Sequence, residues 1–240
     1  MKKSNKFLFT AILILIISLG VYNAALKAEY RKGTYNDPYQ NFTALSFKNF
    51  NEVALNAGSV INVKIERGNY RVRVHNNVSE FLKIRQEGNR LIVDVIYPGE
   101  RKRIWANNHV IIACPDLQSL QTNTVYKANG KIITDKKVNQ HEITIEGLAQ
   151  EKLNLNLDNA SRVLMAHNRI HTLEAIAGKS SGSFSGLNLA PDNQVKAANL
   201  DIRSQSQLVF DNLVIPDLTY TFSDSAQLDM KGSALQLLKR

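Results

Sequence analysis

The chain has 240 residues and a mass of 26.9 kDa, with 44% hydrophobic residues, 21% charged residues, 12 glycines and five prolines. This composition suits a folded domain with a sizeable core, and it excludes a collagen-like or low-complexity chain. The single cysteine excludes an internal disulfide, a structural zinc site with paired cysteine ligands and an iron–sulfur cluster.

The formal net charge of +9 is concentrated at the N-terminus. The first 32 residues carry a net charge of +5, because Glu29 is their only acidic residue, and +4 remains for the other 208 residues. The basic residues of this segment are Lys2, Lys3, Lys6, Lys27, Arg31 and Lys32. Such a distribution is typical of the flanks of a membrane segment, so we predict no nucleic-acid partner.

An apolar segment of 20 uncharged residues lies between Lys6 and Lys27. A helix of that length spans about 30 Å, the thickness of the hydrocarbon core of a bilayer. The sequence therefore predicts a signal anchor or transmembrane helix over residues 1–27. A cleaved signal peptide is the alternative, although the alanines at positions 24, 25 and 28 fit a cleavage site poorly.

A short polar segment, residues 28–44, is expected to link this helix to the folded domain. It contains Gly33, the turn signal Asn36-Asp37-Pro38 and three tyrosines. The tyrosines would lie at the level of the lipid headgroups or simply in a solvated linker. The remaining chain, residues 45–240, is the predicted folded domain.

Alternation with a period of two begins after this linker. Residues 60–65 and 70–74 alternate on either side of a turn, and so do residues 82–84 and 91–95. These patterns predict two β-hairpins. No segment after residue 40 has the pattern of an amphipathic helix of three turns, so we expect the domain to be all-β.

The C-terminal half contains a repeat of about 20 residues. Residues 157–165, 202–210 and 222–230 each have apolar residues at their first, seventh and ninth positions, and residues 177–185 form a weaker copy. The copies start 20, 25 and 20 residues apart, and the five extra residues are Ala190–Gln194. Short units of this kind bury their apolar faces only when they are stacked.

This repeat predicts a single-stranded right-handed parallel β-helix, in which successive copies lie one strand spacing, about 4.8 Å, apart. The first residues of the blocks, such as Leu157, Ile202 and Phe222, would then lie side by side. The polar centres of the blocks would form stacked corners. A β-sandwich with evenly spaced hairpins is the alternative fold.

The layout resembles the exported bacterial family named putative auto-transporter adhesin, head GIN domain, and especially its membrane-anchored members. The resemblance covers residues 20–238 and rests on the anchor, the segment Phe50–Leu55 before Gly58, the strand Val110–Leu117 and the Ser/Asn/Asp-rich repeats. It implies a β-helix in a bacterial cell envelope. We accordingly expect a single-pass inner-membrane protein with residues 28–240 in the periplasm, or a secreted or periplasmic protein if the signal is cleaved.

The predicted outward positions of the repeat offer no set of catalytic residues. Asp158 is expected near Arg162 and Arg203 as a surface ion pair, and no column pairs two carboxylates or collects ligands for calcium. The five histidines are expected at the surface, and no phosphate loop, dinucleotide fingerprint or zinc-protease motif occurs. The sequence therefore predicts no catalytic residue, cofactor or metal site.

Two surface features are candidates for binding. Leu164, Phe184 and Val209 share the eighth position of their blocks and would form an exposed apolar strip, unless the register slips at the second copy. Arg101, Lys102, Arg103 and Trp105 are a candidate contact for anionic lipid or glycan, or they form a solvated loop.

The sequence thus favours a non-enzymatic, membrane-anchored envelope protein that recognises a protein or glycan partner. The alternative is a carbohydrate-active enzyme, a polysaccharide lyase or hydrolase, on the same scaffold.

Overall fold

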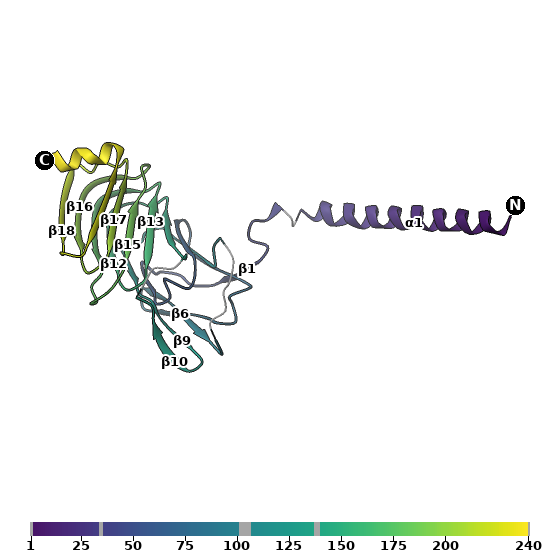
Figure 1. The fold of residues 1–240 in the computed structure, drawn as a ribbon, viewed down its shortest axis with the longest axis horizontal. Helices are drawn as coiled ribbons and strands as arrows, with labels where there is room; N and C mark the ends of the chain where they lie inside the picture. The colour runs from purple at the N-terminus through teal and green to yellow at the C-terminus, as the bar shows by residue number, and fades with distance from the viewer. Residues whose placement is uncertain (1, 34–35, 101–106, 137–139, 240) are drawn as a thin grey trace. The chain divides into compact units, whose positions relative to one another are not determined.

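The structure is a computed structural model that describes residues 2–33, 36–100, 107–136 and 140–239 (Figure 1). The chain divides into two compact units, residues 1–42 and residues 43–240. The first unit is helical and the second is almost entirely β-structure.

Helix α1 (Lys3–Lys32) forms the first unit and has no buried residue of its own. It is long and apolar enough to cross a membrane and lies near the N-terminus, as a signal anchor or a signal peptide would. It extends five residues beyond the predicted segment, because residues 28–32 continue the helix with good helix formers. The helix ends at Gly33, whose left-handed φ of 70° lets its N–H donate to the Tyr30 carbonyl at 3.1 Å.

The second unit contains two sheets. The order of the first sheet is β1 (Phe42–Leu45), β4 (Arg71–His75), β7 (Val110–Cys114), β3 (Val63–Arg67), β11 (Ile143–Glu146), β13 (Arg162–Ala166), β15 (Gly186–Leu189), β17 (Gln207–Asp211) and β19 (Gln227–Lys231). The order of the second sheet is β10 (Lys131–Thr134), β9 (Val125–Ala128), β6 (Arg90–Tyr97), β2 (Glu52–Leu55), β8 (Ser119–Thr122), β12 (Ala149–Leu157), β14 (Arg169–Ala177), β16 (Gln194–Ile202) and β18 (Asp217–Phe222), with β5 (Leu82–Glu87) paired to β6. A 3₁₀ helix, η2 (Gly232–Lys239), follows β19.

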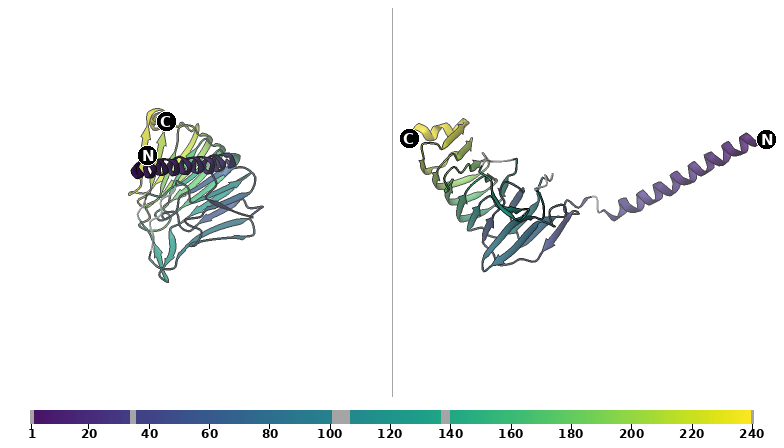
Figure 2. Two further views of the ribbon diagram at one scale, coloured as in Figure 1. Left: turned by 90° about the vertical axis from the view of Figure 1, so that its right-hand side faces the viewer. Right: turned by 60° about the horizontal axis from the view of Figure 1, so that its bottom comes forward.

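The core consists of inward-facing aliphatic residues from both sheets. From residue 143 the chain alternates between the sheets, and each strand pairs in parallel with the strand two places later (Figure 2). Burial alternates along these strands, as in β16, where Ala198, Leu200 and Ile202 are buried and Asn199 is exposed. Period-two side-chain alternation therefore places one apolar face of each strand in the core.

The all-β prediction is confirmed for the second unit, but the finer prediction is not. The two sheets are mixed and do not form a closed solenoid, because β4 pairs with β7, β5 with β6 and β9 with β10 in antiparallel fashion. Two mixed sheets around a common core fit the alternative of a β-sandwich.

The register of the repeat is confirmed at the first position of the blocks. Leu157 pairs with Ala177, Ala177 with Ile202, and Ile202 with Phe222. The seventh and ninth positions also match in the first, third and fourth copies.

The second copy is aligned differently from the prediction. Val163 and Met165 pair with Leu187 and Leu189, four residues later than predicted. The turn over residues 178–185 accommodates four of the five extra residues, with Gly178 at a φ of 83°. Only one extra residue lies between β15 and β16, so the predicted five-residue insertion Ala190–Gln194 is wrong. A period counted along the sequence cannot reveal such a loop when its residues are small and polar.

The first predicted hairpin is also wrong, whereas the second is confirmed. β5 and β6 pair antiparallel, but β3 and β4 do not pair with each other. Strand β7 lies between them, parallel to β3 and antiparallel to β4, and the Gly68 N–H donates to the Cys114 carbonyl at 3.0 Å. The fully buried β7 lies far away in sequence, so local alternation gave no indication of this insertion.

Buried asparagines connect successive corners between the sheets. Asn193 donates through Nδ2 to the carbonyls of Met165 and Ala190 at 2.7 and 2.8 Å, and its Oδ1 accepts from the Asn168 N–H at 3.1 Å. Asn168 in turn donates to the Ile145 carbonyl at 2.9 Å. These bonds satisfy buried backbone groups where the chain leaves the ladders.

We expect Gly178→Ala to destabilise the domain more than Gly182→Ala. Both glycines have positive φ, so alanine costs about 1–2 kcal/mol at either position. Only at Gly178 would the new Cβ lie 2.2 Å from the Arg203 carbonyl oxygen, whereas nothing lies within 4 Å at Gly182. The clash should add about 1–3 kcal/mol. Denaturant unfolding of both variants measures the difference, and equal losses would contradict the register of this corner.

Candidate functional site

The first residues of three parallel strands, β12, β14 and β16, lie side by side in the second sheet. Ala149 pairs with Arg169 and Gln150 with Ile170, and the same positions of β14 pair with Gln194 and Val195. Parallel, in-register pairing therefore aligns residues that are 20 and 25 residues apart in sequence.

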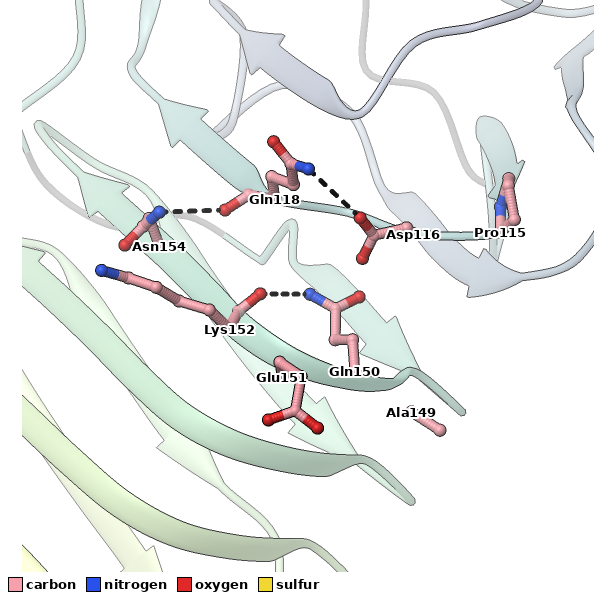
Figure 3. A pocket seen from close by; sticks show the side chains of 8 residues that line it. All are labelled: Pro115, Asp116, Gln118, Ala149, Gln150, Glu151, Lys152 and Asn154. Atoms are coloured by element: carbon pink, nitrogen blue, oxygen red, sulfur yellow. Dashed lines mark hydrogen bonds between the residues drawn. The ribbon is translucent and has the colours of Figure 1, made fainter.

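Two adjoining hollows run across these strand starts and share Ala149, Gln150 and Glu151. We call them together the strand-start groove. The first hollow has a volume of about 480 Å³ and is lined by Pro115, Asp116, Gln118, Ala149, Gln150, Glu151, Lys152 and Asn154 (Figure 3). The second has a volume of about 740 Å³, and its further lining residues are Arg169, Ile170, His171, Asn193, Gln194, Val195, Lys196, Val214 and Pro216.

Gln150 fixes one wall of the strand-start groove. Its Nε2 donates to the carbonyls of Leu117 and Lys152 at 2.6 and 2.7 Å, and its Oε1 accepts from the Leu117 N–H at 3.1 Å. Asn154 donates to the Gln118 carbonyl at 3.2 Å (Figure 3). These amides connect β12 to the segment before β8, so they form the wall of the groove and are already engaged with the backbone.

Most of the charged side chains of the groove are accessible. The side chain of Glu151 is 92% exposed and lies 3.4 Å from His171, and Lys152 pairs with Glu174 at 2.7 Å. Arg169 and Lys196 are exposed as well. Basic groups outnumber the carboxylates of Asp116 and Glu151 in the lining. The groove therefore combines hydrogen-bonding groups and a small excess of basic side chains with the buried apolar side chains of Ile170 and Val195.

Asp158, the acidic residue singled out in the sequence, stabilises a corner. Its carboxylate accepts from the Ser180 hydroxyl at 2.5 Å, from the Ser180 N–H at 2.9 Å and from the Asn159 N–H at 3.0 Å. Partial burial raises the pKa of the Asp158 carboxyl, but the hydrogen bonds from Ser180 and Asn159 outweigh burial and hold the pKa below its ordinary value. The predicted partner Arg203 instead pairs with Asp201.

Cys114 and Glu142 are two acidic groups whose pKa values burial raises. Burial, with a smaller effect of Asp116, raises the pKa of the Cys114 thiol to about 12. The thiol is therefore protonated and unreactive at neutral pH, and Cys114 packs in β7 as a small buried hydrophobic residue. Burial also raises the pKa of Glu142, and the charge of Arg162 partly offsets this effect.

The structure corrects the predicted apolar strip. In the register of the first sheet, Leu164 pairs with Asn188 and Asn188 pairs with Val209, so a polar residue separates the two apolar ones. Phe184 lies in the turn before β15, outside this column. All three predicted residues are half-buried. The predicted strip does not form because the second copy is shifted by four residues in the register of the sheet.

The predicted contact for anionic lipid or glycan lies outside the described residues; it consists of Arg101, Lys102, Arg103 and Trp105. The prediction that every histidine lies at the surface is wrong for His109, which is fully buried and whose Nδ1 accepts from the Asn62 N–H at 2.8 Å. Within the described ranges, no group of three or more His, Cys, Asp or Glu side chains is placed to hold a metal ion.

The strand-start groove is not among the predicted sites, although the sequence contains a signal for it. Each strand start has an apolar or amide residue followed by charged or polar ones, as in Gln150-Glu151-Lys152 and Val195-Lys196. Aligning the segments between the blocks, rather than the blocks themselves, would have shown these positions stacked.

Comparisons with known proteins place the chain in no family. No family model matches it, and no curated protein matches it. Among solved structures it is similar to a putative adhesin from Bacteroides fragilis NCTC 9343, with 12% identity over 80% of this chain and 93% of that chain and a TM-score of 0.45. A putative adhesin from Parabacteroides merdae ATCC 43184 has 11% identity, coverage of 80% and 95%, and a TM-score of 0.33.

A third similar structure is a putative lipid binding protein from Parabacteroides distasonis ATCC 8503, with 15% identity, coverage of 80% and 94%, and a TM-score of 0.35. Two of these three neighbours are described as putative adhesins, and no match shows the head GIN domain family for this chain. Because their TM-scores lie below 0.5, these likenesses say nothing about the function of this chain.

We expect Asp158→Ala to lower the free energy of unfolding by about 1–3 kcal/mol at neutral pH, because it removes charge-assisted hydrogen bonds at a corner. The pKa of Asp158 is lowered on folding, so its contribution is present above the unfolded pKa of about 3.9 and is lost as the pH falls through the folded pKa.

Denaturant unfolding between pH 7 and pH 3 measures this effect. The difference between Asp158→Ala and the unmodified chain should shrink with falling pH. Asp224→Ala, which removes an exposed aspartate at the corresponding corner of the last repeat, is the control and should change little. A difference that stays constant with pH would contradict the assigned role.

Proposed function

We propose that the chain is a non-enzymatic, membrane-anchored protein of the bacterial cell envelope that binds an acidic glycan in the strand-start groove. The observation that carries this proposal is the continuous groove across β12, β14 and β16, with exposed basic side chains above an apolar floor.

The spacing of the groove suits an extended polymer. Neighbouring strands lie about 4.8 Å apart, so a chain lying across them meets a new set of polar side chains at each strand. Arg169 and Lys196 come from the neighbouring strands β14 and β16 and offer cationic donors to carboxylate or sulfate groups, while Lys152 of β12 is shared with Glu174. Amide and imidazole groups of Gln194 and His171 can exchange hydrogen bonds with hydroxyls.

We infer that the segment from β11 to β19 is a short parallel coil that presents this surface. Its strands alternate between two sheets and pair only in parallel, and crossover connections of this type are right-handed in nearly all proteins. A coil repeats its outward positions at each turn, which is how such scaffolds build elongated binding surfaces.

The described residues of the groove favour binding over catalysis. General acid–base cleavage of a glycan requires a pair of carboxyl groups with pKa values set apart by their surroundings. Of the two carboxylates in the lining, Glu151 is engaged with His171 and Asp116 accepts a hydrogen bond from Gln118. A polysaccharide lyase or hydrolase remains a distinguishable outcome of the binding experiment.

We assign the anchoring role to α1. Its length, its lack of burial within the protein and the basic residues at both ends suit a single inner-membrane span with residues 28–240 in the periplasm. A signal peptide removed on export is the other role that this helix fits.

The binding proposal predicts that the detergent-solubilised full chain captures acidic polysaccharides from a panel of acidic and neutral ones. Lys196→Glu should weaken capture at least tenfold, because it reverses a charge inside the groove. Lys179→Glu is the matched control, since this exposed lysine lies in the turn after β14 and outside the groove lining. Equal binding by both variants, or release of new reducing ends or unsaturated sugars, would overturn the proposal.

The anchor predicts that the mature protein keeps its full mass and stays in the membrane fraction after alkaline extraction. A 20-residue apolar helix inserts too stably to be stripped from a bilayer by loss of surface charge. Intact mass spectrometry of the mature chain is the measurement, and loss of the first 25 to 28 residues would show that the segment is a cleaved signal instead.

A further inference from the structure

Strands β18 and β19 are the last strands of the two sheets, and they differ in how they are covered. Helix η2 packs against β19 and β17, with Ala234 and Leu237 buried. In the described part of the chain, β18 pairs with β16 on one side and with no strand on the other, at the C-terminal end of the stack (Figure 1).

The inward-facing side chains of β18 are only partly covered. Leu218, Tyr220 and Phe222 pair with Ala198, Leu200 and Ile202, which are all fully or almost fully buried. Tyr220 is 38% exposed, and Leu218 and Phe222 are half-buried. The apolar interior is therefore open at this edge.

The backbone of the same three residues faces the free edge. The Ser223 N–H donates to the Ile202 carbonyl at 3.0 Å, so position 223 faces β16. The direction of the backbone N–H and C=O groups alternates along a strand, so those of Thr219 and Thr221 also point toward β16. Those of Leu218, Tyr220 and Phe222 point away from β16, toward the free edge. Such a row of groups is a template for another strand.

Strand β18 lacks the residues that usually keep a free edge strand from pairing with another strand. Residues 218–222 are Leu-Thr-Tyr-Thr-Phe, a segment of high β-propensity with no charge, proline or glycine. Asp217 is the only charged residue of the strand. An edge of this composition pairs readily unless a partner already covers it.

The segment is also nearly palindromic about Tyr220. In an antiparallel pair centred there, Leu218 lies opposite Phe222 of the second copy, Thr219 opposite Thr221, and Tyr220 opposite its own equivalent. The two residues of each pair then have similar polarity and lie on the same face of the sheet. Asp217 lies opposite Ser223, so no like charges meet.

We propose that two copies of this chain pair through β18 in an antiparallel, two-fold symmetric manner centred on Tyr220. Leu218, Tyr220 and Phe222 lie at the hydrogen-bonded positions of the new ladder and exchange six N–H···O bonds, and the second sheet continues from one copy into the other. The pairing covers the open apolar edge of both copies at once, as an isologous interface requires.

A cysteine at the centre tests the geometry directly. Directly opposed residues at a hydrogen-bonded position have Cα atoms about 5.5 Å apart and Cβ atoms about as far apart, which is too wide for an unstrained disulfide but within reach of a short reagent that links two thiols. Tyr220→Cys in the full chain, in detergent, should therefore form a species of twice the monomer mass when treated with a short bis-maleimide. Val214→Cys is the matched control, because Val214 is 37% exposed but precedes β18.

The native Cys114 is buried in β7 and should not contribute to this cross-link. Equal cross-linking of both variants, or none with Tyr220→Cys at concentrations where the unmodified chain is dimeric, would overturn the proposed centre. A monomeric unmodified chain at about 100 µM would overturn the proposal itself.

Charge pairs on the outward face test the direction of pairing. Thr219 and Thr221 are exposed, so substitutions there spare the core. The double variant Thr219→Lys/Thr221→Lys places like charges opposite each other and should raise the dimer dissociation constant at least tenfold. Thr219→Glu/Thr221→Lys places opposite charges together only in the antiparallel register and should restore dimerisation.

All variants retain α1, so association through that helix cannot explain a difference between them. Mass measurement by light scattering, with subtraction of the detergent, gives the oligomeric state. Dimers that persist unchanged in the like-charge variant would show that another surface joins the copies, and failure of the opposite-charge variant to recover would exclude the antiparallel register.

Discussion

In-register parallel pairing between strands about 20 residues apart is the interaction on which the C-terminal half depends. Leu157, Ala177, Ile202 and Phe222 occupy one column of the second sheet, and three of the four are buried there. Each strand supplies the backbone partners and part of the apolar cover of its neighbours. A one-residue slip would turn an entire apolar column to solvent, so burial of the column fixes the register.

The corners determine whether this stacking can continue, because the chain leaves the ladder there and its polar groups become buried. Asn168 and Asn193 satisfy the carbonyls at one corner, while Asp158 and Ser180 hold another. Counted between paired residues, the connection from β15 to β16 is only one residue longer than that from β13 to β14, and Asn193 reaches its corner there without disturbing the register of β14 and β16. The strand-start groove is a consequence of this regularity, since the residues that follow each corner are polar and aligned.

The molecule thus carries three surfaces with different chemistry on one chain. Helix α1 is apolar throughout its middle, the strand-start groove is polar with a basic excess, and the edge of β18 offers unpaired backbone beside half-covered apolar side chains. A polar groove on a tethered domain suits recognition of a charged polymer. A self-complementary edge would double the number of grooves held together, and paired weak sites bind a polymer more tightly than one site does.

The sequence by itself determined the apolar helix, the strands of alternating pattern and the columns begun by Leu157, Ile202 and Phe222, because these depend on composition and on periods within about 20 residues. Only the tertiary structure decided that β7 inserts between β3 and β4, that the second repeat slips by four residues, and that Asn188 separates Leu164 from Val209. Those outcomes depend on pairing between distant segments, where many registers satisfy the local pattern and only simultaneous burial of both partners selects one. The groove belongs to the second group, since its lining comes from segments that become neighbours only when the strands are stacked.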